Sequence, residues 1–284
     1  MDEPEAKVVN ETTASDRRAL RLQKRKNRAF ELDFLRGFAI CVMLWHHTAY
    51  DLRYIFKYDI FGFIDPDGRW FWGMFHPFFL SLFVGISGIC CQFSKNNFKR
   101  ALKVAAVALL FSAVSITADK KLDLGCAVYF NVLHLIALGT FLFAIFDHVE
   151  QKKTSSRDSR GGTMFLLMML LVFFILFKAV PYYDYLFPTP WVNFLGLEPA
   201  PGHSLVMGDV IGIVPWLGIF IFGVLIGRMV YPTKETFFPN APKAVRAISR
   251  PFEWIGRHSL IIYLLHQPVI LGGLYFLQYL GVVK

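Results

Sequence analysis

The residues with the clearest chemical potential in this sequence are histidines inside long apolar stretches. His47, His134 and His266 each lie in a different apolar run. An ionisable side chain in such surroundings is costly unless it is paired or faces a cavity. Neutral imidazole is also well suited to remove a proton from an amine or hydroxyl near pH 7. These three histidines therefore indicate general-base catalysis.

Asn131, Tyr50 and Gln267 each lie within about one helical turn of one of these histidines. An amide or phenol at that spacing can orient an imidazole or stabilise an oxyanion. A buried histidine can equally satisfy a backbone group, so a structural role stays open for all three. We interpret the neighbouring His46, which points about 100° away from His47 on a helix, as structural.

A pair of opposite charges marks the beginning of the first apolar run. Asp33 and Arg36 are three residues apart and are neighbours on a helix. His47 follows Arg36 by eleven residues, which returns it to nearly the same face about 16 Å further along. One helix thus carries a charged pair at one end and a histidine at the other. The pair either neutralises itself at the helix entry or attracts an anion.

Seven apolar segments are long enough to hold these residues inside a membrane. Hydrophobic residues form 55% of the 284 residues and charged residues 18%, whereas a soluble domain carries roughly 25% charged residues. Mean hydropathy is +0.45, and one span needs about 20 residues. We predict an all-α polytopic transmembrane bundle with about seven spans: Phe30–Tyr50, Trp70–Phe93, Ala101–Ala118, Cys126–Phe146, Met164–Val180, Asp209–Val230 and Ser259–Leu280.

The chain divides into a basic tail, residues 1–29, and a transmembrane domain, residues 30–284. The first apolar run is too long for a cleavable signal peptide. The four cysteines fall within or at the edge of spans and are interpreted as core residues. No acidic side chain lies at metal-ligand spacing beside His47 or His134, so no metal is expected.

Positive charge predicts the orientation of the spans. Of the 30 Lys and Arg residues, 22 lie on the side of the N-terminal tail and six on the opposite side. Six of the 22, from Arg228 to Arg257, are expected in a cytosolic loop between the sixth and seventh spans. The positive-inside rule therefore predicts a cytoplasmic N-terminus and an extracytoplasmic C-terminus. Membrane topology and anionic lipid account for the net charge of +9, so no nucleic-acid partner is expected.

Two spans contain features that shape the interior. Asp209 is expected in the first turn of the sixth span, where the helix dipole favours an acid. Pro215, followed by Trp216, is expected to interrupt that span, and broken helices are tolerated where they line cavities. Gly85 and Gly88, and the pair Gly223 and Gly227, are expected to allow close helix contact.

Four segments carry a family resemblance. They read ELDFLRGFAICVMLWHHTAYDL, FNVLHLIALG, GIVPWLGIFIFGVLIGR and EWIGRHSLIIYLLHQPVIL. In order and spacing they resemble the heparan-α-glucosaminide N-acetyltransferase family of transmembrane acyltransferases in its short bacterial-type form, from Phe30 to about Gly273. The resemblance implies acyl transfer from a cytosolic acyl-CoA, usually acetyl-CoA, to an amine or hydroxyl of a sugar-like acceptor outside.

The resemblance also implies an active-site histidine. His47 and His134 match the histidine positions of the short bacterial relatives. The animal lysosomal enzymes carry theirs in the loop before the second span, and the matching stretch here, Asp65–Trp70, has none.

The candidate residues fall into three groups, for catalysis, for binding acyl-CoA and for binding the acceptor. The catalytic candidates are His47, His134, Asn131 and His266. The candidates for binding acyl-CoA are Arg36, Asp33, Arg257 and Arg100. The candidates for binding the acceptor are Tyr50, Asp51, Asp209, Trp216 and Gln267.

Two other classes of protein remain as alternatives. A transporter of a small polar solute would also need polar groups at mid-membrane and broken helices. An inverted repeat would favour transport, and the sequence shows none. A structural scaffold would not need buried polar residues on a helix face. The acceptor, the acyl chain and the oligomeric state, a homodimer included, stay open.

Overall fold

The computed structural model describes residues 29–58, 71–122, 125–155, 159–204, 209–232 and 235–282. The predicted tail up to residue 28 and the stretch Asp65–Trp70 lie outside these residues. The described helices are α2 (Phe30–Tyr54), α3 (His76–Phe93), α4 (Asn97–Leu122), α5 (Val132–Thr154), α6 (Arg160–Tyr183), α7 (Ile213–Val230), α8 (Lys243–Arg257) and α9 (Ser259–Tyr279), with short helical turns η1 (Phe71–Phe75) and η2 (Pro190–Phe194).

The predicted all-α polytopic bundle is confirmed for the described part of the chain. Six helices, α3 to α7 and α9, are long and apolar enough to cross a membrane. The first predicted span corresponds to α2, which has 25 residues but carries Glu31, Asp33 and Arg36 in its first two turns. These charges lower its hydropathy, whereas its length of about 37 Å at 1.5 Å per residue suffices for a bilayer.

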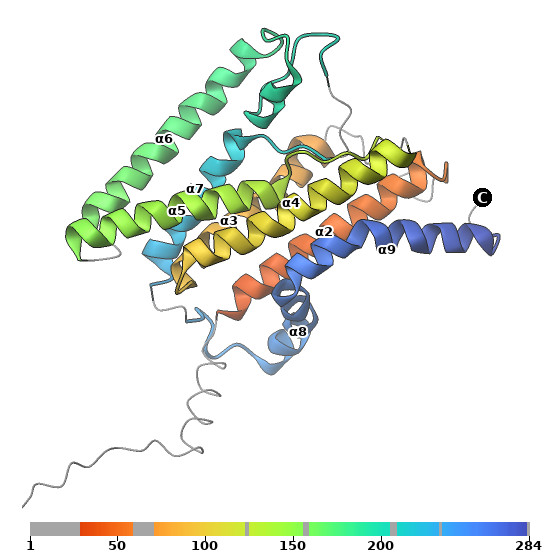
Figure 1. Ribbon diagram of the computed structural model, residues 1–284. Coiled ribbons are helices and arrows are strands. Elements are labelled where there is room, and N and C mark those ends of the chain that lie inside the picture. Colours follow the sequence, from red (N-terminus) through yellow and green to blue (C-terminus); the bar gives the residue numbers. More distant parts are fainter. Residues whose placement is uncertain are drawn as a thin grey trace, which may run out of the picture.

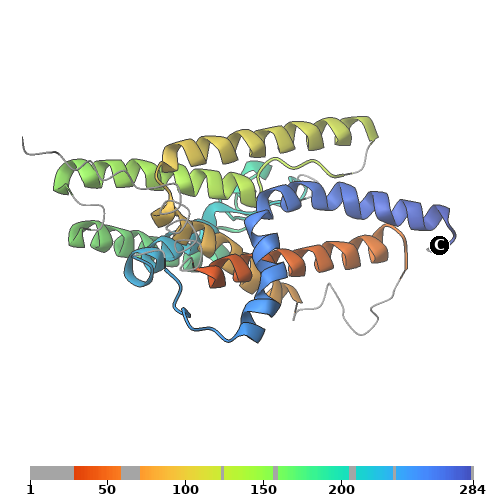
Figure 2. The same ribbon diagram turned by 90° about the horizontal axis from the view of Figure 1, so that it is seen from below.

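The helices pack into a bundle in which distant segments lie side by side. Figures 1 and 2 show α4 beside α5 and α2 beside α9. At the centre, α3 packs against α7 through Gly88 and Gly223, as predicted. A Cβ atom at either glycine would overlap the backbone of the facing helix. Close approach of two backbones therefore requires glycine at these positions.

The predicted start of the fourth span, Cys126, was wrong. α5 begins at Val132, because Asn131 is its N-cap and accepts a hydrogen bond from the backbone N–H of Leu133 at 3.1 Å. An N-cap has non-helical backbone angles, so the chain before it is extended. Cys126 consequently lies outside the helix.

Two expectations for the sixth span were also wrong. Asp209 lies before α7, which begins at Ile213, and so does not occupy its first turn. Val214 has an extended backbone (φ −96°, ψ 128°), and regular helix follows from Pro215. Proline at the first helical position lacks only an N–H that would have no partner there. Pro215 therefore starts the regular helix and does not interrupt it.

The stretch between α7 and α9, predicted to be a cytosolic loop, contains the additional helix α8. α8 crosses α2 steeply instead of running along it (Figure 2). The two helices touch at Gly37 and Gly256, where a Cβ atom on either would overlap the other backbone. The loop prediction missed α8 because its 15 residues are too polar and too few for a span.

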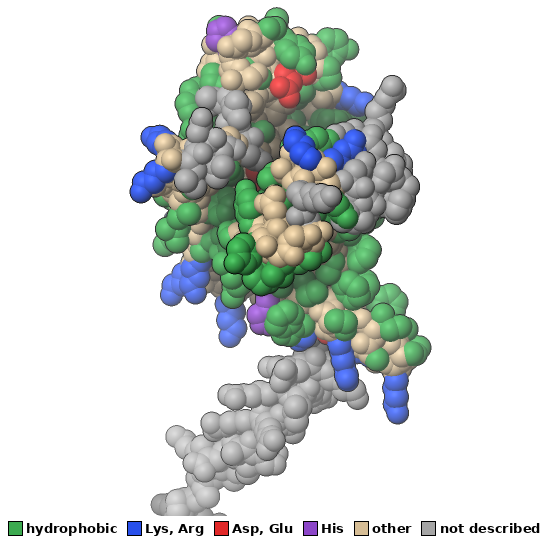
Figure 3. Space-filling view, turned by 90° about the vertical axis from the view of Figure 1, so that its right-hand side faces the viewer, with side chains coloured by type: hydrophobic (Ala, Val, Ile, Leu, Met, Phe, Trp, Pro, Cys, Tyr) green, Lys and Arg blue, Asp and Glu red, His purple; other side chains and the backbone are tan. Residues whose placement is uncertain are grey.

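Much of the outer surface of the bundle is apolar. In α6 only Leu166 is buried, and most of its large hydrophobic side chains are exposed. Figure 3 shows hydrophobic side chains over much of one end of the molecule, with several Lys and Arg side chains projecting from its lower part. Such an exterior fits a protein whose solvent is lipid.

Candidate active site

A cavity of about 100 Å³ lies between α2, α3 and α9, beside the middle of α2 and the first half of α3. Its described lining is mostly apolar, with three histidines, one carboxyl group and one phenol. The lining residues are Ala39, Ile40, Val42, Met43, His46, His47, His76, Phe79, Leu80, Phe83, Val132, Asp209, Ile211 and Tyr263. An apolar cavity with a few convergent polar groups is the usual form of a small-molecule site.

Imidazoles from three helices gather at this cavity. The rings of His47 on α2 and His266 on α9 are 4.8 Å apart between centroids. His46 lies 5.3 Å from His47 and 6.1 Å from His76, which begins α3. His46, which was interpreted as structural, also lines the cavity. The 100° between adjacent helical positions is small enough for both rings to border one cavity.

Tyr263 connects this cluster to other polar groups. Its hydroxyl donates a hydrogen bond to Asp209 Oδ2 at 3.4 Å and accepts one from Asn131 Nδ2 at 3.3 Å. Its backbone carbonyl contacts Nδ1 of His266. Tyr263 was not among the predicted site residues. Its partners come from segments more than 50 residues away, which helix periodicity cannot reveal.

His134 lies behind the cavity and does not line it. Its Nδ1 is 2.9 Å from Asn131 Oδ1, and its Nε2 is 3.3 Å from Ser112 Oγ. The backbone N–H of Asn131 also donates a hydrogen bond to His134 Nδ1 at 3.3 Å, which makes the two residues the capping box of α5. Among the described residues, Asn131 and Tyr263 link His134 to the cavity.

The candidates for binding the acceptor occupy different places. Asp209 lines the cavity. Asp51 is 1% exposed and accepts hydrogen bonds from Gln267 Nε2 at 2.9 and 3.1 Å, which joins the end of α2 to the middle of α9. Tyr50 is 40% exposed, and Trp216 packs against the main hydrophobic core. The structure therefore brings Asp209 into the site and Asp51 and Gln267 together beside it.

The candidates for binding acyl-CoA meet at the opposite end of the bundle. Arg36 lies 3.5 Å from the Asp33 carboxylate, as the spacing predicted. Its other contacts are Cys90 Sγ at 2.8 Å and the carbonyl of Gly256 at 3.4 Å. Arg36 thus links α2 to α3 and α8.

Two further arginines lie near that contact. Arg100 donates a hydrogen bond to the carbonyl of Ser87 near the end of α3 at 3.3 Å. Arg257 pairs with Glu253 at 4.0 Å, and its side chain remains 38% exposed. Arg36, Arg100 and Arg257 therefore all lie around the meeting point of α2, α3 and α8.

Comparison with known proteins identifies the family. A family model described as heparan-alpha-glucosaminide N-acetyltransferase, catalytic, matches residues 28–268. The chain belongs to this family. No curated protein and no solved structure matches the chain. Because the family is one of membrane acetyltransferases, the protein is an integral membrane acyltransferase.

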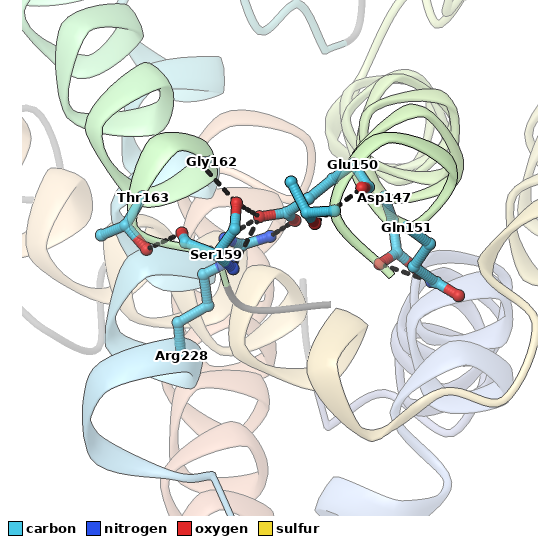
Figure 4. Close-up of polar contacts among 8 residues, drawn as sticks. Asp147, Glu150, Gln151, Ser159, Gly162, Thr163 and Arg228 are labelled. Atoms are coloured by element: carbon cyan, nitrogen blue, oxygen red, sulfur yellow. Dashed lines mark hydrogen bonds and ion pairs between the residues drawn. The ribbon is translucent and has the colours of Figure 1, made fainter. Parts of the chain in front are cut away.

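This acyltransferase has a second buried polar cluster, away from the cavity. Glu150 on α5 pairs with Arg228 on α7, and both side chains are at most 3% exposed. Figure 4 shows the Glu150 carboxylate between Arg228 and Ser159, whose hydroxyl donates to it at 2.6 Å. Arg228, which was counted as a loop cation, belongs to the last turn of α7. Its partner is 78 residues away, so no local spacing could have predicted the pair.

Proposed function

We propose that this acyltransferase moves an acetyl or similar acyl group from a cytosolic acyl-CoA to a sugar-like acceptor on the other side of the membrane. The observation that carries the proposal is the cavity lined by His47, Tyr263 and Asp209, where the ring of His47 is also in contact with His266. These groups combine a proton acceptor with hydrogen-bond donors in apolar surroundings, as acyl transfer requires.

The proposed orientation has the N-terminus in the cytoplasm. It rests on the 22 Lys and Arg residues on that side against six on the other. The cavity then lies toward the extracytoplasmic side, and Arg36, Arg100 and Arg257 lie at the cytoplasmic end. This arrangement brings the donor and the acceptor to the bundle from opposite sides.

The cytoplasmic arginines are proposed to attract the CoA phosphates. Guanidinium groups bind phosphate through charge-assisted hydrogen bonds. Arg36 and His47 lie on the same helix, roughly 16 Å apart at 1.5 Å per residue. The long pantetheine arm of CoA then extends along α2 and carries the thioester toward the cavity.

In the proposed chemical step, His47 is the general base. Its neutral imidazole removes a proton from the acceptor amine or hydroxyl as that nitrogen or oxygen attacks the thioester carbonyl. The carbon–sulfur bond breaks, CoA leaves as the thiolate, and the imidazolium returns the proton to it or to water. The amide of Gln267 supplies a hydrogen bond to the oxyanion. The Tyr263 hydroxyl, which donates its proton to Asp209, orders the polar side of the cavity.

Asn131 and His134 are proposed to act indirectly, through Tyr263. Asn131 holds the Tyr263 hydroxyl, and His134 holds Asn131. His134 is then a positioning residue, whereas His266 orients or substitutes for His47, which its ring contacts.

The function is tested with purified protein in sealed liposomes that contain glucosamine as the probe acceptor. Radiolabelled acetyl-CoA is added outside, and the vesicle contents are analysed for acetylated glucosamine. Label inside the vesicles supports transfer across the bilayer. Acetylation only on the side of acetyl-CoA contradicts it, and glucosamine efflux without acetylation indicates the alternative of a solute transporter.

The orientation is tested separately by labelling cysteines introduced at exposed positions. A membrane-impermeant thiol reagent added to intact cells is expected to reach His203→Cys, in the loop after α6, and to miss Lys153→Cys at the end of α5. The reverse labelling pattern would show that the protein has the opposite orientation in the membrane. It would also contradict a cytoplasmic site for CoA.

A further inference from the structure

Helix α8 has one face committed to the bundle. Ser249, Glu253 and Gly256 are buried against α2. At about 100° per residue these positions fall within one sector of the helix. Ser249 donates a hydrogen bond to Glu253 at 2.6 Å, so the polar groups of this face are satisfied within the protein.

The remaining surface of α8 divides into two flanks of opposite character. Val245 and Ile248 are 48% and 67% exposed and form an apolar flank. Lys243 and Arg250 are also exposed, and helical geometry places them roughly half a turn away from the apolar flank. A helix with an exposed apolar side and an exposed basic side is typical of the membrane interface.

The position of α8 agrees with that pattern. The helix lies across α2, beside Gly37, near the end of the bundle where α2 begins. Because α8 crosses α2 steeply and packs one face against it, the two flanks point in opposite directions along α2. An exposed apolar flank is stable toward hydrocarbon, and exposed cations are stable toward lipid phosphates and water. Trp254, which is 57% exposed, is of a type enriched at this boundary.

We propose that α8 is an interfacial helix that binds the anionic phospholipid surface of the cytoplasmic leaflet. Val245 and Ile248 enter the boundary of the acyl chains, while Lys243 and Arg250 pair with headgroup phosphates. The ligand is an anionic lipid because its charge complements this flank, whereas a zwitterionic lipid gives no net attraction. The proposal does not depend on acyl transfer, and Arg257, which the proposed function assigns to CoA, has no part in it.

The charge argument is tested on the whole protein in neutral detergent. Phosphatidylglycerol or phosphatidylcholine is added, and the lipid concentration that gives half of the maximal thermal stabilisation is measured. Phosphatidylglycerol is expected to stabilise at lower concentration. The double variant Lys243→Gln/Arg250→Gln should raise its half-maximal concentration about tenfold or more, since each cation near the surface contributes about fivefold.

Lys120→Gln/Lys121→Gln is the matched control, because it also removes two exposed cations, but from the last turn of α4 instead of from α8. It is expected to change the half-maximal concentration less than twofold. An equal loss in both double variants would assign the effect to net charge and overturn the proposal. Equal stabilisation of the unsubstituted protein by the two lipids would overturn it as well.

The orientation of the apolar flank is tested with adjacent substitutions in lipid nanodiscs. Ile248→Glu places a charge toward hydrocarbon, and Ala247→Glu places the same charge on a neighbouring exposed position outside the apolar flank. Ile248→Glu is expected to lower the melting temperature clearly, and Ala247→Glu to leave it nearly unchanged. Equal melting temperatures for the two variants would show that α8 does not enter the bilayer. A soluble protein partner would then be the better explanation of its exposed face.

Discussion

The protein contains two buried polar clusters that differ in how completely their groups are satisfied. At one end, Glu150 is held by Arg228 and Ser159, all contributed by helices or helix caps that meet there. At the other, His47 and Tyr263 border a cavity, and their neighbours leave room for another molecule. Both clusters are costly to bury, but only one offers space for a ligand.

The difference indicates how a buried polar group in a membrane protein can be interpreted. A charge with a complete set of protein partners maintains the helix packing, and its removal leaves the partner uncompensated. A polar group that borders a cavity can exchange its contacts for those of a substrate. We therefore expect variants of the first cluster to lose stability and variants of the second to lose activity.

The largest effect is expected for His47→Ala. Loss of a general base typically lowers the rate about 10²–10⁴-fold, while the melting temperature should change little because the ring borders a cavity. Acetyl transfer to glucosamine and thermal unfolding are measured on the same preparation. His148→Ala, at an exposed position of α5, is the control and should keep full activity. Full activity of His47→Ala would transfer the role of base to His266.

The next largest effect is expected for Glu150→Gln, on stability. Removing one partner of a buried ion pair typically costs about 3–5 kcal/mol. The variant should unfold at a clearly lower temperature in detergent, while the activity per folded molecule stays near normal. The double variant Glu150→Leu/Arg228→Met leaves no buried charge and should recover much of the stability. A stable but inactive Glu150→Gln protein would show instead that this cluster takes part in catalysis.

A smaller effect is expected for Arg36→Gln, which removes charge but retains hydrogen-bonding capacity. Arg36 has protein partners and is also proposed to bind phosphate. The variant therefore tests whether a residue that maintains helix packing can also bind a ligand. We expect about 10- to 100-fold weaker CoA binding by calorimetry, because hydrogen bonds to charged groups contribute about 1.5–3 kcal/mol. Unchanged CoA affinity in a well-folded variant would leave Arg36 as a link between α2, α3 and α8 only.

The smallest effect is expected for Tyr263→Phe. The substitution removes the hydroxyl between Asn131 and Asp209 but keeps the ring. A hydrogen bond of this kind contributes about 1 kcal/mol, so the turnover number should fall about fivefold. The Michaelis constant for acetyl-CoA should stay the same, since the arginines are at the other end. A change in that constant without a change in turnover would contradict the proposed position of the reaction.

The amino-acid pattern alone was sufficient for the membrane class, most of the spans and three histidines of interest. Apolar runs of span length have few alternatives to a helix in lipid, because every backbone polar group must be satisfied within the segment. The Asp33–Arg36 pair was equally accessible, since a spacing of three residues makes neighbours on any helix. These features depend on local sequence.

Other features were decided only by tertiary structure. Glu150 and Arg228 are 78 residues apart, and His47 meets His266 from a helix at the other end of the chain. His46 and Tyr263 joined the site because of the angles at which α2, α3 and α9 pack. α8 packs against α2 because glycines on both helices permit close contact. Helix periodicity defines which residues share a face, but the faces that meet depend on packing between helices, which has no local signature in the sequence.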